Sequence, residues 1–253
     1  MKKSIFSLVI IIFIMTIPIQ ADIYMVNKQH TDGMAVMGKQ QPDQDIIQKV
    51  WITKNKIKSE SEDQTIFILM DEKKIIALNH EDKTYTELPM GFSNMMGKAM
   101  ENQKDEDKEE MEQFMQMAKG MMKFEIKVTP TSETKKINKW QCKKYNQEVK
   151  IGMGPINSEV WATEELEMDY EVYAQFSTAM MSMQPGFSDS FENAMTELKK
   201  IKGVPVFTET IMNMMGMQMK TTQELLEFKE ANAPKGTFDI PKGYKKTEMM
   251  GGH

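Results

Sequence analysis

The chain has 253 residues, of which 28 are Met, 32 are Lys and none is Arg, and its formal net charge is −5. An acidic chain without the bidentate guanidinium group is poorly suited to polyanions, so nucleic acid is not expected as a partner. The length fits one domain. The single cysteine, Cys142, cannot close an intramolecular disulfide, so stability must come from a hydrophobic core.

The N-terminus has the order of a secretory signal peptide. Two lysines precede an apolar run at 5–14, Pro18 breaks the run, and the small residue Ala21 follows. The run is shorter than the ~20 apolar residues that a membrane-spanning helix needs. We therefore predict a signal peptide at 1–21, cleavage after Ala21, and a single periplasmic domain at 22–253 without a transmembrane segment.

Residues 22–88 have the pattern of an antiparallel meander. Turn residues recur about every ten positions, at Asp71 and again at His80 to Asp82, between runs of strand-forming residues. The segment 64–70 is apolar at both odd and even positions. This predicts a central strand that is covered on both faces.

The composition changes after Leu88. The segment at about 89–120 is rich in Met and acids at helical spacing, which predicts a helical Met-rich acidic insert. Strand alternation returns from 123 onward, and a short strand through Val160 and Trp161 precedes a helix that is expected to open near Thr163.

The C-terminal third predicts a second helix and a hairpin. Helical spacing covers 189–200, and Gly203 then turns the chain into two strands that are joined at 213–216. A last edge strand ends near Pro241. Together the elements predict an α+β fold, with a strongly curved antiparallel sheet and helices packed on one side.

Five motifs, in this order, carry a resemblance to a known family: QTIFILMDEKKIIALNHEDKTYTEL, INKWQCKKYNQ, EVWATEEL, GVPVFTET and FDIPKGYKK. They resemble an exported bacterial family of unknown function, of the DUF4412 type. Its layout is similar to that of periplasmic lipoprotein and lipid carriers of the LolA and LppX kind. The resemblance implies an incomplete barrel with helices on its concave side. It implies no established activity, because fold does not determine function.

The first candidate site is an apolar stripe on the helix expected after Thr163. Such a stripe is ordinarily a packing face; here it could also hold an acyl chain between the helix and the sheet. We therefore predict a binding or carrier protein for a hydrophobic small molecule or lipid, with no cofactor and with any protein partner unknown. The predicted ligand-binding residues are Tyr170, Tyr173, Phe176, Met180 and Met183.

The alternative is a copper(I) protein. Thioether sulfur is a soft ligand that suits Cu(I), and five methionines crowd the predicted hairpin turn. Read as a regular strand, their side chains divide between two faces, so a metal site depends on the turn at 213–216. The alternative metal ligands are Met212, Met214, Met215, Met217 and Met219.

An enzyme is not expected. The three histidines, His30, His80 and His253, stand in no recognisable catalytic motif, and His80 falls in a predicted exposed turn. Cys142 is expected to be a half-buried side chain in a strand, although a reactive thiol remains an alternative.

Overall fold

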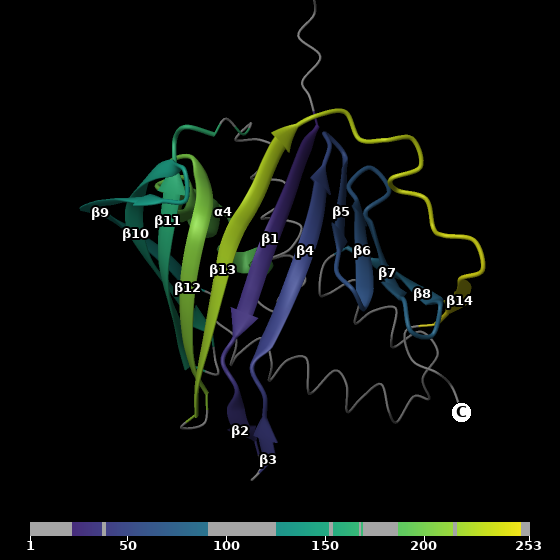
Figure 1. The fold of residues 1–253 in the computed structure, drawn as a ribbon, viewed down its shortest axis with the longest axis horizontal. Helices are drawn as coiled ribbons and strands as arrows, with labels where there is room; N and C mark the ends of the chain where they lie inside the picture. The colour runs from purple at the N-terminus through teal and green to yellow at the C-terminus, as the bar shows by residue number, and fades with distance from the viewer. Residues whose placement is uncertain are drawn as a thin grey trace, which may run out of the picture.

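The computed structural model describes residues 22–36, 39–90, 125–151, 154–166, 168, 187–214 and 217–248. Twelve strands form one open sheet in the order β14-β8-β7-β6-β5-β4-β1-β13-β12-β11-β10-β9 (Figure 1). The strands of this sheet are β1 (Ile23–Thr31), β4 (Gln44–Ile52), β5 (Lys56–Glu60), β6 (Gln64–Leu69), β7 (Lys74–Asn79), β8 (Thr84–Pro89), β9 (Glu125–Ile137), β10 (Trp140–Ile151), β11 (Gly154–Thr163), β12 (Val204–Met214), β13 (Met217–Glu230) and β14 (Lys245–Thr247). A small ribbon of β2 (Met34–Val36) and β3 (Lys39–Gln41) extends from the β1–β4 end.

The sheet consists of two meanders joined through the first strand. Strands β4 to β8 pair in chain order on one side, and β9 to β13 pair in chain order on the other. Strand β1 lies between β4 and β13, and it pairs antiparallel with both. All neighbours are antiparallel except the short β14, which runs parallel to β8 at the edge. The centre of the sheet is therefore built from strands about two hundred residues apart, as the pair of Ile23 and Glu230 shows.

The predicted α+β class is wrong. Of the described residues, 66% lie in strands, and they contain one short helix, α4 (Phe187–Leu198), rather than helices packed along one side of the sheet. The physical reason is that β9 to β13 are long strands of ten to fourteen residues, which make up more than half of the described residues from 125 onward. The helical insert predicted at about 89–120 lies outside the described residues, apart from residues 89 and 90 at its start. Residues 164–166, where a helix was expected to open, form a bend.

Helix α4 lies behind β12 and β13 in the view of Figure 1. Its buried residues Ala194 and Leu198 pack against Ile126 of β9 and Val149 of β10. We call the face of the sheet that carries these two strand residues the α4 face. Because side chains alternate along a strand, every second residue of β9 and β10 near this contact points to the α4 face.

The core lies on both faces of the sheet. A large cluster joins the two meanders and includes Met25, Ile52 and Ile68, which lie on the α4 face. On the opposite face Phe67 and Leu78 are 1% and 2% exposed and are covered by the C-terminal segment 231–244. Strand β6 is therefore buried on both faces, as its sequence predicted. Burying each such large side chain contributes about 2 kcal/mol to the hydrophobic stabilisation.

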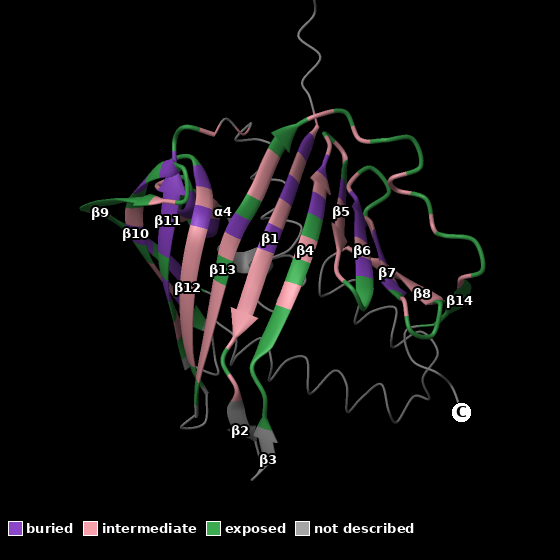
Figure 2. Ribbon diagram, in the orientation of Figure 1, coloured by how far each residue is buried: buried purple, intermediate pink, exposed green. Residues whose placement is uncertain are grey.

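Burial decreases along the central strands. Figure 2 shows buried positions in β1 and β4 near the end where β1 begins, and exposed or intermediate positions towards β2 and β3. The buried part of these strands is thus at the end where β1 begins, and the solvent-exposed part is at the end near β2 and β3.

No helix among the described residues is both long enough and apolar enough to cross a membrane.

Candidate functional site

A pocket of about 280 Å³ lies on the α4 face, where the two meanders meet. Strands β1, β4, β10, β11, β12 and β13 line it, together with Ile201 after α4. We call it the α4-face pocket. Its apolar wall is formed mainly by Met25, Val50, Ile52, Val206 and Leu225.

The pocket also has a polar wall, which we call the polar band. Its members carry uncharged amide or hydroxyl groups on the α4 face of the six neighbouring strands from β4 to β10. The polar band consists of Asn27, Gln48, Gln147, Ser158, Thr208, Thr210 and Gln223.

The strand register brings these residues together. Asn27 of β1 is paired with Gln48 of β4, and Thr208 of β12 is paired with Gln223 of β13. Ser158 of β11 is opposite Thr210 on one side and Gln147 on the other. Paired residues on one face of a sheet lie about 5 Å apart. The polar band therefore extends across these strands from β4 to β10, with Asn27 opposite the apolar Leu225 where β1 meets β13, although its members are spread over most of the chain.

The polar band is partly buried and is open to further hydrogen bonding. Asn27 is 9% exposed and Ser158 is 8% exposed. The hydroxyls of Ser158 and Thr210 share a hydrogen bond of 2.9 Å. Within the described part of the chain, no hydrogen bond engages the side-chain amides of Gln48 and Gln147. These groups are available to a ligand or to water.

Two larger hollows differ from this pocket in chemistry. One of about 410 Å³ is bordered by charged residues that include Lys127, Glu159 and Glu209. The other, of about 380 Å³ beside α4, is bordered by Glu197 and Lys200 among others. Ligand pockets combine apolar walls with a few placed polar groups, and the α4-face pocket fits this description better.

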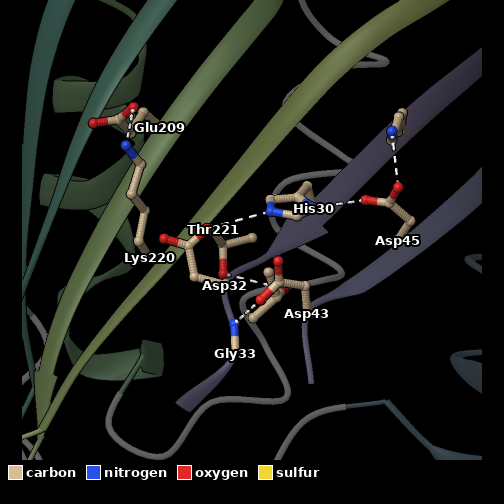
Figure 3. Close-up of polar contacts among 10 residues, drawn as sticks. His30, Asp32, Gly33, Asp43, Asp45, Glu209, Lys220 and Thr221 are labelled. Carbon is tan, nitrogen blue, oxygen red and sulfur yellow. Dashed lines mark hydrogen bonds and ion pairs between the residues drawn. The ribbon is translucent and has the colours of Figure 1, made fainter. Parts of the chain in front are cut away.

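A charged cluster lies on the opposite face of β1 and β4 (Figure 3). His30 Nδ1 is 2.7 Å from Asp45 Oδ1, and His30 Nε2 is 3.3 Å from Asp32 Oδ1. Lys28 Nζ is 2.9 Å from the second carboxylate oxygen of Asp45. Both imidazole nitrogens thus face carboxylates, which leaves neither free to activate a nucleophile.

The electrostatics of this cluster follow from these contacts. The hydrogen bond to Asp45 raises the pKa of His30 above its ordinary value. The contacts with Lys28 and then His30 lower the pKa of Asp45. Among the described residues there is no group of three or more His, Cys, Asp or Glu that could hold a metal ion. The cluster is a solvated ion network on the surface.

His80 is half-buried, so its predicted exposure is wrong. Its Nε2 is 3.0 Å from Thr65 Oγ1, and its Nδ1 is 2.5 Å from Tyr244 Oη. A hydroxyl, an imidazole and an orienting group in a row have the form of a catalytic triad. Thr65 is only 2% exposed, however, so a substrate cannot reach its hydroxyl. The contacts instead attach the C-terminal segment to β6 and β7.

Cys142 lies in strand β10, as expected, but it is fully buried rather than half-buried. It is 1% exposed, and its thiol donates to the carbonyl of Trp140 at 3.6 Å. Burial raises the pKa of the thiol, which disfavours the reactive thiolate. Its chief contribution is therefore to packing.

The predicted ligand stripe at 170–183 lies outside the described residues. Of the predicted copper ligands, Met212 is paired with Met219, and Met214 is paired with Met217, on either side of the hairpin turn. Met212 follows Thr210 by two residues and Met219 precedes Thr221 by two, so both lie on the α4 face beyond the polar band. Met215 lies outside the described residues.

Sequence reasoning missed the α4-face pocket. The available signal was the presence of Asn, Gln, Ser and Thr at positions whose neighbours two residues away are apolar, such as Asn27 after Met25 and Ser158 before Val160. In one strand this pattern indicates nothing specific. The pattern indicates a pocket only when the strand register brings such residues from several strands together on one face.

The comparisons with known proteins give no family. No protein-family model matches the chain, and no curated protein matches it. Among solved structures, that of PNGF-II in the C2 space group is similar with a TM-score of 0.37 and 13% identity. The match covers 90% of this chain and 31% of that chain, so this chain spans about a third of that protein's length. The resemblance to the exported family of unknown function stays a prediction.

Proposed function

We propose that the protein is a non-enzymatic binding or carrier protein for a hydrophobic ligand such as an acyl chain or lipid. The ligand is held in the α4-face pocket, and the protein acts in the periplasm after an N-terminal signal peptide is removed. The observation that carries the proposal is the pocket itself, whose lining of apolar and uncharged polar groups suits such a ligand. The lysines and apolar run at the N-terminus support export.

The pocket volume limits how much of the ligand is enclosed. A volume of about 280 Å³ corresponds to roughly nine water molecules, or to an alkyl segment of similar heavy-atom number. Burying about ten methylene groups is worth roughly 8 kcal/mol before the entropic cost of association is subtracted. We therefore expect affinities in the micromolar range or weaker.

Binding is tested with the neutral fluorophore N-phenylnaphthylamine and with a variant that fills the pocket. Thr208 lines the pocket from β12, and an aromatic side chain is tolerated in a strand. The variant Thr208→Trp should weaken binding of the fluorophore at least about tenfold. Native mass spectrometry of protein purified from its own cell envelope should also show a bound lipid.

The matched control is Thr222→Trp. Thr222 lies on the neighbouring strand of the same hairpin, on the face opposite to the pocket, where it is paired with Glu209. This variant should bind the fluorophore as the wild type does. The proposal fails if the wild type binds neither fluorophore nor lipid, or if both Trp variants bind equally well while folded.

A second candidate function is copper(I) binding, which the hairpin register favours. Two successive methionine pairs, Met212 with Met219 and Met214 with Met217, flank the turn. The thioethers of Met212 and Met219, at directly paired positions of one face, suit a soft metal ion. A competition titration with Cu(I) tests it, comparing Met212→Leu with the control Met195→Leu on α4. No affinity stronger than micromolar, or equal affinities in the two variants, removes this candidate.

A further inference from the structure

The polarity of the α4-face pocket changes in one direction along its strands. On β1 the lining changes from Met25 to Asn27. On β4 the lining changes from Val50 to Gln48, which is paired with Asn27. On β12 it changes from Val206 to Thr208. The change from apolar to polar has the same direction on all three strands because the strand register aligns them. The pocket therefore has an apolar end, near the start of β1, and a polar end that is formed by the polar band.

The pocket lining contains no charged residue among the described part of the chain. The nearest lysines on β1 and β13 are Lys28 and Lys220, and strand alternation places both on the opposite face. Each of them also has an acidic partner there. Lys220 Nζ is 2.9 Å from Glu209 Oε2, and Lys28 is bound to Asp45. No cation in the described lining would compensate an anionic group in the pocket.

The amides and hydroxyls of the polar band both donate and accept hydrogen bonds. An ionised carboxylate or phosphate transferred into the pocket would lose hydration without gaining a counter-charge, which is costly. An uncharged group that donates and accepts, such as an amide, a hydroxyl or an ester, would exchange its water contacts for protein contacts at little cost.

We propose that the ligand of the α4-face pocket is a neutral amphiphile. Its apolar chain lies against Met25, Val50 and Leu225, and its uncharged hydrogen-bonding group lies against the polar band. Free fatty acids and phospholipid head groups are excluded from the pocket. This inference rests on the proposed function, because it specifies the chemistry of the ligand that the same pocket binds.

The experiment is a displacement assay with chain-matched ligands. The protein is first loaded with N-phenylnaphthylamine, and decanamide, decanol and decanoate then compete at a pH of about 8, where the carboxylate is ionised. Decanamide and decanol should displace the fluorophore. Decanoate should need a concentration at least about tenfold higher.

A double variant tests the polar band directly. Gln48→Leu combined with Gln223→Leu removes two amides from the pocket lining and replaces each with an apolar side chain of similar volume. This variant should bind decanamide about tenfold more weakly and bind the fluorophore unchanged. Gln141→Leu, which changes an exposed glutamine of β10 outside the pocket, is the matched control.

The outcomes separate the two proposals. If the fluorophore binds but decanoate competes as well as decanamide, the neutral-amphiphile inference is overturned and the binding function stands. Unchanged decanamide affinity in the double variant also overturns the inference. If the fluorophore does not bind the wild type, the proposed function fails, and the inference fails with it.

Discussion

Gly203 offers a sharp test of the junction that positions β12 next to the pocket. It has a φ of 82°, a left-handed conformation, and it immediately precedes β12. A Cβ atom at this position would lie 1.9 Å from the carbonyl oxygen of Thr163 and 2.8 Å from the amide nitrogen of Glu164. Both atoms belong to the backbone, so no side-chain rotation relieves the contact. Gly203→Ala must therefore force β11 and β12 apart at their paired ends.

The magnitude follows from two contributions. The left-handed conformation alone costs an alanine about 1 to 2 kcal/mol. The backbone contact adds to this, because separating the pair of Thr163 and Val204 breaks strand pairing at a position where Thr163 is fully buried. We expect Gly203→Ala to lower the free energy of unfolding by at least about 3 kcal/mol, out of a total of roughly 5 to 15 for a domain.

Gly243 is the matched control. It also has a positive φ, of 92°, but a Cβ at this position would meet no heavy atom within 4 Å. Gly243→Ala should therefore cost only the conformational part, about 1 to 2 kcal/mol. Urea unfolding of both variants, followed by far-ultraviolet circular dichroism, measures the difference. An equal decrease in the free energy of unfolding in the two variants would refute the argument that the close contact of Gly203 with Thr163 holds the ends of β11 and β12 together.

Two further predictions concern the histidines. In Asp45→Asn the pKa of His30, followed by NMR titration, should fall towards its ordinary value, since Asp45 is the largest cause of its rise. Because His30 has a raised pKa, its contribution to stability is full below its unfolded pKa and is lost as the pH rises through the folded pKa. The lowered pKa of Asp45 means that its contribution is lost as the pH falls through that value. An unchanged His30 titration in the variant would contradict the assignment. Tyr244→Phe should lower the free energy of unfolding by about 1 kcal/mol, because it removes the hydrogen bond to the half-buried His80. A variant as stable as the wild type in urea would show that this hydrogen bond does not stabilise the attachment of the C-terminal segment.

Local features of the fold could be predicted from the sequence. The turns at Asp71 and His80, the antiparallel pairing of β12 with β13 and a helix near 189–200 are all present. Each depends on residues within about ten positions, such as turn formers between alternating strands, and short-range patterns determine such features. The position of Cys142 in a strand was also predicted from such a short-range pattern.

The class of the fold could not be predicted in this way. The apolar spacing indicated helices packed along one side of the sheet, whereas the described residues contain one helix, α4. The helices that were expected at about 89–120 and after Thr163 fall largely outside the described residues. The position of β1 between β4 and β13 could not be predicted either, since local propensity does not encode a partner about two hundred residues away.

The sequence by itself determined the composition of the candidate site: uncharged polar residues and apolar residues, at alternate positions of strands that were mostly predicted correctly. Only the tertiary structure decided that Asn27, Gln48, Ser158, Thr210 and Gln223 meet on one face. The physical reason is register. A shift of one residue between two strands moves every side chain to the other face of the sheet, and that register is fixed by the packing of the whole sheet rather than by any single segment.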